Sequence, residues 1–146
     1  MATFDTSGLD GLIADMRRMG EYSGKVADAM CFAAAEEIRG AWKTVATRKR
    51  IRKTGQMIDS INYPHKVTDV GGVKSIDIYP QGKDSRTGVR NATKAFILYH
   101  GSSRWKNREG RTYHWTDEAD EMSAQPVQQR LEKMWDDFLK TGRVPS

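Results

Sequence analysis

Three histidines are the first residues of this 146-residue chain to consider for catalysis or metal binding. His65, His100 and His114 could serve as general bases or as metal ligands. None of them has another His, a Cys or a carboxylate at the spacing of an HExxH or CxxC zinc motif. The single cysteine, Cys31, is remote from them in the sequence and has no disulfide partner, which favours a reducing compartment. We expect the histidines to be structural.

Other patterns that carry catalysis are equally weak. The glycines do not stand in a phosphate-binding register with lysine, and no GxSxG element surrounds a serine. Four carboxylates, at positions 117, 118, 120 and 121, could pair for acid or base chemistry. At the start of a helix, however, acidic residues are expected because they complement the helix dipole. The sequence therefore predicts a protein that is not an enzyme, with no catalytic residue, no metal site and no cofactor.

One basic run is the strongest candidate for contact with a partner. Residues 48–53, RKRIRK, hold five positive side chains: Arg48, Lys49, Arg50, Arg52 and Lys53. Each phosphate that such a run neutralises adds affinity that does not depend on sequence and that falls with salt. The alternative is a solvated loop with no ligand. Aromatic residues, which would favour single-stranded nucleic acid, are absent from the run.

The net charge of +5 hides a segregated pattern. Residues 41–112 carry 16 basic and 5 acidic side chains, whereas residues 1–40 and 113–140 are both net acidic. Such asymmetry is explained by neutralisation within the chain, by contact between neighbouring subunits, or by a basic face turned toward nucleic acid. The sequence leaves these three explanations open.

The elements that would position these residues begin with a helix. Glycines interrupt the first 20 residues, so we expect a flexible arm over residues 1–20 with a short helical turn near residues 9–16. Apolar residues then recur every three or four positions over residues 22–47, which predicts a long amphipathic helix. Residues 21–146 are expected to form a single α+β domain, a length that buries a core without disulfides.

The rest of the chain predicts a small antiparallel sheet and two further helices. A short helix capped by Thr54 is expected at residues 54–59, followed by strands at 60–68 and 75–79 around a turn at 69–72. After a basic loop at 81–90, Asn91 is expected to cap a helix that Gly101 ends. A last helix carries apolar residues from 127 to 138 on one face and stops at Gly142, with Pro126 either starting or kinking it.

The chain has no apolar run of the roughly 20 residues that a membrane helix needs, and its N-terminus lacks the layout of a signal peptide. We therefore expect a soluble protein that is not exported and that has no membrane partner.

Three segments in a fixed order resemble the neck or tail-completion proteins of long-tailed bacteriophages. They are TGQMIDSI at residues 54–61, NATKAFILYHGSS at residues 91–103, and His-Trp at 114–115, and the resemblance covers roughly residues 26–139. Within these segments, the residues that we expect to serve packing are Thr54, Gly55, Ser60, Asn91, Phe96, Gly101 and Trp115.

The resemblance implies a structural virion protein without catalytic residues, which is made in the host cytoplasm and assembled into the virion. It implies a ring homo-oligomer at the head-to-tail junction, for which sixfold symmetry is favoured over twelvefold. The ring would meet the connector and the tail proteins and would surround double-stranded DNA without reading its sequence.

Within that picture the charged segments have two uses. The basic run at 48–53 is expected to face the DNA lumen or a neighbouring virion protein. Subunit contacts in a ring are heterologous, and basic and acidic segments of the chain could supply their two sides. The residues that we expect in those contacts are Arg104, Lys106, Arg108, Arg111, Asp117 and Glu118. The alternative function is a small basic DNA-binding accessory protein that contacts phosphates non-specifically.

Overall fold

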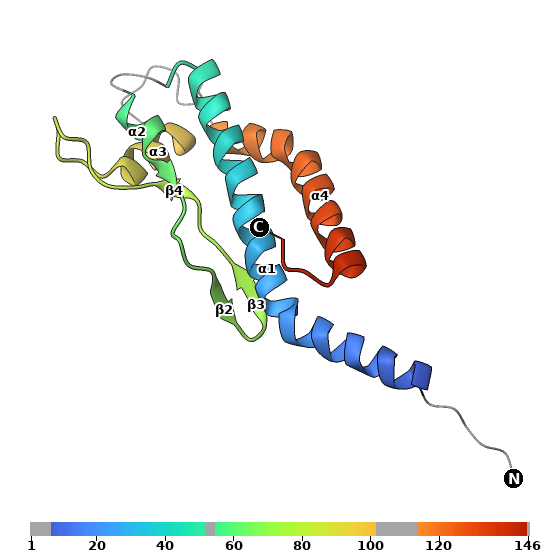
Figure 1. Ribbon diagram of the computed structural model, residues 1–146. Coiled ribbons are helices and arrows are strands. Elements are labelled where there is room, and N and C mark those ends of the chain that lie inside the picture. Colours follow the sequence, from blue (N-terminus) through green and yellow to red (C-terminus); the bar gives the residue numbers. More distant parts are fainter. Residues whose placement is uncertain (1–6, 52–54, 102–113, 146) are drawn as a thin grey trace, which may run out of the picture.

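The computed structural model describes residues 7–51, 55–101 and 114–145, and it combines helices with small antiparallel sheets (Figure 1). A 42-residue helix, α1 (Ser7–Arg48), is the longest described element. The last helix, α4 (Trp115–Thr141), packs along one side of α1. The short helices α2 (Gln56–Asp59) and α3 (Asn91–His100) lie near the C-terminal end of α1. The α+β class expected from the sequence is confirmed.

The second half of α1 is the frame on which the other elements pack. Its fully buried side chains include Val26, Ala35 and Val45, and several of its buried positions are alanines. Small side chains let a neighbouring helix approach closely, and α4 makes its main contacts here. The amphipathic pattern over residues 22–47 therefore predicted the helix correctly, and α1 ends one residue later than expected.

The first half of α1 differs from the expected arm. The helix begins at Ser7 and continues without a break through Gly8, Gly11 and Gly20, and Figure 1 shows this part projecting away from the body. A glycine costs a helix about 1 kcal/mol relative to alanine, which weakens the helix without ending it. Extension from an already formed helix adds one hydrogen bond for each residue fixed, so the docked half supports the projecting half. The first six residues lie outside the described ranges.

The C-terminal end of α1 is a Schellman motif. Ile51 N–H donates to the Ala46 carbonyl at 3.0 Å, and Arg50 N–H donates to the Thr47 carbonyl at 3.0 Å. Arg50 takes the left-handed conformation that the motif requires, with φ of 56°. Ile51 is buried in the core. The start of the basic run is therefore the folded end of a helix, and not the loop that its composition indicated.

Four short strands form two separate antiparallel pairs. β1 (Ile61–Asn62) pairs with β4 (Tyr79–Pro80), and β2 (Thr68–Val70) pairs with β3 (Val73–Ser75). The turn between β2 and β3 is Gly71–Gly72, with φ of 60° and 82°, as a tight hairpin requires. The sequence predicted two longer strands around this turn. Pro64 and Pro80 have no N–H for a ladder, which limits the β1–β4 pair to two residues on each side.

Helix α3 begins differently from the prediction. Its N-cap is Arg90, and Asn91 is its first helical residue. The Asn91 side-chain amide donates to the Gln81 carbonyl at 2.9 Å, so it ties α3 to the preceding loop and does not cap the helix. Gly101 ends α3, as expected, with φ of 78°.

Helix α4 is longer than predicted and bends. It begins at Trp115, and Pro126 lies inside it. Proline has no amide hydrogen to donate to the preceding turn, and Figure 1 shows α4 changing direction between its first and last turns. Gly142 closes the helix, as expected, and its N–H donates to the Phe138 carbonyl at 2.7 Å.

Two tryptophans hold the core where α1, α3 and α4 meet. Trp115 is fully buried, and its ring meets that of Trp42 edge-on at a centroid distance of 5.5 Å. The Trp115 indole nitrogen lies 3.5 Å from the Ala95 carbonyl, and the Trp42 indole donates to Asp120 at 2.9 Å. Around this pair lie buried side chains from the end of α1, from α2, β1 and α3: Ala46, Ile51, Met57, Ile58, Ile61 and Ala95.

Among the described helices, none combines the length and the apolarity that crossing a membrane requires.

Candidate functional site

A polar cluster joins the end of α3 to the start of α4. Asp117 accepts a hydrogen bond from the Tyr99 hydroxyl at 3.0 Å and lies 3.0 Å from Nδ1 of His114. The rings of Tyr99 and His114 stack at 4.6 Å, and His114 N–H donates to the Tyr99 carbonyl at 3.0 Å. Asp117 also stands in the first turn of α4, where a carboxylate complements the helix dipole. These contacts give the cluster a structural role in docking two helices.

The other histidines and the carboxylates do not form a metal centre in the described ranges. His100 packs against Phe96 at a ring distance of 4.2 Å, and His65 lies 6.5 Å from the ring of Tyr63. Over residues 7–51, 55–101 and 114–145 no three His, Cys, Asp or Glu side chains are grouped as metal ligands.

The basic run is partly neutralised inside the chain. Arg48 forms an ion pair with Glu118, and Nζ of Lys49 lies 2.9 Å from Oε2 of the same glutamate. We expected these two basic residues to face DNA or a neighbouring protein, and we expected Glu118 to face another subunit. The fold brings the three side chains together within one chain, because α4 starts beside the end of α1. Arg52 and Lys53 lie outside the described residues.

The residues expected in subunit contacts also fall into two groups, those paired within the chain and those outside the described ranges. Asp117, like Glu118, is engaged within its own chain, and their contact with a neighbouring subunit stays a prediction. The four basic residues of this set, Arg104, Lys106, Arg108 and Arg111, lie outside the described ranges.

The residues expected to serve packing have varied surroundings. Trp115 and Asn91 are buried, as is Gly55, which takes a φ of 81° before α2. Ser60 is half-buried, and its hydroxyl donates to the Met57 carbonyl at 2.7 Å. Gly101 is the C-cap of α3, and Thr54 lies outside the described residues.

Phe96 is a correction to this set, because 63% of it is exposed. It lies on the face of α3 that points away from the core, whereas Ala95 beside it is buried. The helical period alone did not reveal which face of α3 the other elements would cover.

The basic loop expected at residues 81–90 is folded, and it was not among the residues expected to bind a partner. Asp84 is buried at its centre and accepts hydrogen bonds from the amides of Arg86 at 2.8 Å and Thr87 at 3.0 Å. It also forms an ion pair with Lys94 of α3. Lys94, followed by these two amides, lowers the pKa of Asp84 from 3.8 to about 2. An Asp whose side chain binds amides two and three residues ahead is a recognisable turn signal that was present in the sequence.

A second anchor fixes the loop to α2. The Gln56 side chain donates to the Ser85 hydroxyl at 2.8 Å and accepts from the Ser85 amide at 2.9 Å. The loop is therefore held from two sides before any partner binds.

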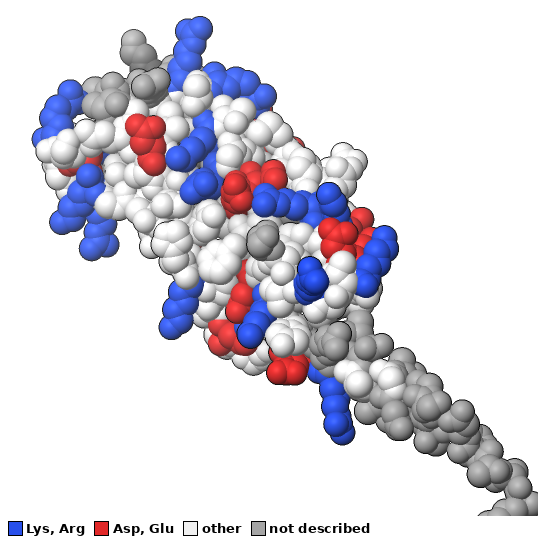
Figure 2. Space-filling view, in the orientation of Figure 1, with Lys and Arg blue, Asp and Glu red and all other residues white. Residues whose placement is uncertain are grey.

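The loop presents three exposed cations, Lys83, Arg86 and Arg90. No carboxylate of the described residues lies within ion-pair distance of any of them. Figure 2 shows Lys and Arg side chains along this side of the molecule. The geometry presents positive charge on a fixed scaffold, which fits binding of an anionic surface.

A shallow groove lies between α1 and α4. It is lined by Glu36, Glu37, Gly40, Ala41, Thr44, Met122, Ser123 and Pro126. Its two glutamates bind Arg130 of α4 at 3.3 and 3.0 Å, so they hold the helices together. The groove therefore belongs to the helix contact.

Comparison of the chain with protein-family models, with curated proteins and with solved structures found no match.

Proposed function

We propose that this chain is a structural virion protein of a phage neck or tail, which joins or completes the head-to-tail junction as a ring around the DNA path. The observation that best supports the proposal concerns the three segments of the resemblance. Met57, Ile58 and Ile61 from the first segment share one buried cluster with Ala95 from the second and Trp115 from the third. The three segments, which are far apart in the sequence, thus pack together in a single hydrophobic core.

Within this proposal the chain acts by binding and not by catalysis. It meets copies of itself, the connector and the tail proteins in the virion, after synthesis in the host cytoplasm. DNA passes through the ring without sequence-specific contacts.

Deletion of the gene from its phage or prophage tests the proposal. We expect DNA-filled heads and separate tails in electron micrographs of the lysate, and we expect the purified protein to restore joined particles. Normal joined particles from the deletion strain would contradict the proposal.

The second candidate is a small DNA-binding accessory protein, which the exposed cations Lys83, Arg86 and Arg90 favour. Phosphate contacts of this kind give a duplex affinity that falls steeply with salt. A protein that binds duplex DNA in this manner, never forms rings and is dispensable for particle joining would favour this candidate over the first.

A further inference from the structure

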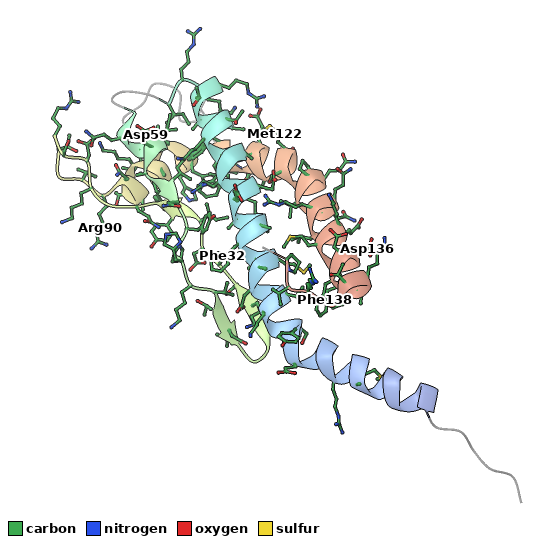
Figure 3. The ribbon with its side chains drawn as sticks, viewed as in Figure 1. Phe32, Asp59, Arg90, Met122, Asp136 and Phe138 are labelled. Carbon is green, nitrogen blue, oxygen red and sulfur yellow. The ribbon has the colours of Figure 1, made fainter. Side chains whose placement is uncertain are left out.

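The outer face of α4 combines apolar and acidic residues at helical spacing. Glu132, Trp135, Asp136 and Leu139 lie three and four residues apart and therefore follow one stripe. Trp135 is 40% exposed and Leu139 is 46% exposed, although the buried side of the same helix holds Phe138. Figure 3 shows Asp136 pointing away from α1 while Phe138 lies on the side toward it. We call this stripe, with Glu121, the anionic face.

Two lysines of α4 adjoin this face. Lys133 and Lys140 lie four and three residues from Asp137 and three and four residues from Asp136. With Asp137 they carry a net charge of +1, so they offset one of the negative charges of the face. The anionic face itself carries three negative charges, at residues 121, 132 and 136, all exposed.

A second exposed face has the complementary composition. Phe96 and Ile97 of α3 are 63% and 41% exposed, and Val89 just before the helix is also exposed. Lys83, Arg86 and Arg90 lie in the adjoining loop. We call these six residues the cationic face. Like the anionic face, it joins large apolar side chains with three charges of one sign, a composition typical of interfaces with an apolar centre and a charged rim.

The two faces lie on different sides of the molecule. Loop 81–90 extends on one side of α1, and α4 lies on the other (Figure 1). Arg90 and Asp136 mark the two sides in Figure 3. A face that met its own copy would bring like charges together, whereas contact between unlike faces pairs opposite charges. Contact between unlike faces also leaves one of each free, so that further copies add until a ring closes.

We propose that the cationic face of one copy binds the anionic face of the next. This inference rests on the ring in the proposed function and adds to it which surfaces meet. Trp135 is the central anchor, because a large aromatic side chain at the middle of an interface carries much of its binding energy. The three cations of loop 81–90 pair with the three carboxylates of the anionic face.

A capping experiment tests the contact with two full-length variants. R86S/R90S disables the cationic face, and W135S/L139S disables the anionic face. Sedimentation equilibrium and native mass spectrometry should show the wild type associating beyond a dimer. Each variant alone should have a self-association Kd raised at least about tenfold. An equimolar mixture still has one intact pair of faces and should form a 1:1 dimer and nothing larger.

K66S/V70S is the matched control, because it removes one exposed cation and one exposed apolar side chain outside both faces. It should associate like the wild type, and circular dichroism should show all variants folded. The proposal is overturned by a wild type that stays monomeric at the highest concentration reached. The proposal is also overturned if either variant alone associates as strongly as the wild type, or if the mixture of the two variants stays monomeric. Loss of duplex DNA binding in R86S/R90S without loss of association would overturn it in favour of DNA on this face.

The experiments distinguish failure of the proposed contact between copies from failure of the proposed function. Variants that stay monomeric when mixed but still restore joined particles would remove only this contact. Joined particles from the deletion strain would remove the proposed function while leaving a measured contact between copies in place.

Discussion

At the scale of single residues, Asp84 explains why a basic loop is folded without a partner. It is the acceptor for two loop amides and the partner of Lys94, so one buried carboxylate organises a loop with three exposed cations. The loop presents its charge in a fixed arrangement, which lowers the ordering cost of binding an anionic surface.

The depressed pKa of Asp84 predicts a pH dependence. Its value of about 2 in the folded protein lies below the ordinary 3.8, so its contribution to stability is complete above pH 3.8 and is lost as pH falls toward 2. Urea unfolding of the wild type and D84N should give a stability difference that shrinks across this window. Amide hydrogen exchange should report faster exchange at Arg86 and Thr87 in D84N. A stability difference that does not change with pH would contradict this role.

The two tryptophans Trp115 and Trp135 predict losses of stability of very different size for the same substitution. Trp115 is fully buried against Trp42, so W115A should lower the free energy of unfolding by about 3–5 kcal/mol. Trp135 is 40% exposed, and W135A should cost about 1 kcal/mol or less in dilute monomer. Denaturant titration at low protein concentration measures both. Equal losses would show that Trp135 belongs to the core and not to a contact surface.

At the scale of elements, α1 is one helix with two environments. From Val26 onward it is covered by α4, the strands and the short helices, while its first turns project into solvent (Figure 1). Its periodicity predicted the covered half. The projecting half is helical because it extends a helix that packing has already stabilised.

The glycines of α1 and of the hairpin predict opposite responses to alanine. A Cβ at Gly40 meets no atom within 4 Å, and the residue lies in a helix, so G40A should stabilise the protein by about 0.5–1 kcal/mol. Gly72 has φ of 82°, a conformation that costs alanine about 1–2 kcal/mol, so G72A should destabilise. Thermal unfolding compares the two. A destabilising G40A would indicate that the groove beside Pro126 has less room than its geometry indicates.

The projecting turns of α1 should also open more readily than the covered ones. A solitary helix of this length is marginal in water, so amide exchange over residues 7–20 should be much faster than over residues 26–46. Hydrogen exchange with mass spectrometry resolves these ranges. Equal protection of both ranges in dilute protein would show that something covers the projecting half.

At the scale of the whole molecule, the segregated charge has two outcomes. Part of it is neutralised within the chain, as in the pairing of Arg48 and Lys49 with Glu118. Another part remains exposed on two separate faces, the cationic face of loop 81–90 with α3 and the anionic face of α4. The composition left three explanations open. Neutralisation within the chain accounts for the charges at the end of α1, and the proposed contact between copies accounts for the charges that stay exposed.

Salt should weaken the proposed contact between copies. The screening length falls from about 10 Å at 0.1 M salt to about 3 Å at 1 M, so pairing across the rim of the interface is lost first. We expect the self-association Kd to rise roughly tenfold or more over that range, a change of about 1.4 kcal/mol. Sedimentation equilibrium at several salt concentrations measures it. An association that strengthens with salt would indicate an apolar contact without the charge pairing.

The sequence by itself determined the α+β class, the covered part of α1, the last turns of α4 and the glycines that end α3 and α4. These properties depend on periodicity and on capping, which act over a few neighbouring residues. Only the tertiary structure decided that Glu118 neutralises the start of a basic run 70 residues earlier. It also decided that Gln56 anchors Ser85 and that Phe96 stays exposed while Ala95 is buried. Such outcomes depend on which elements meet in space, so the accessible charged and apolar surfaces could not be read from the order of the residues.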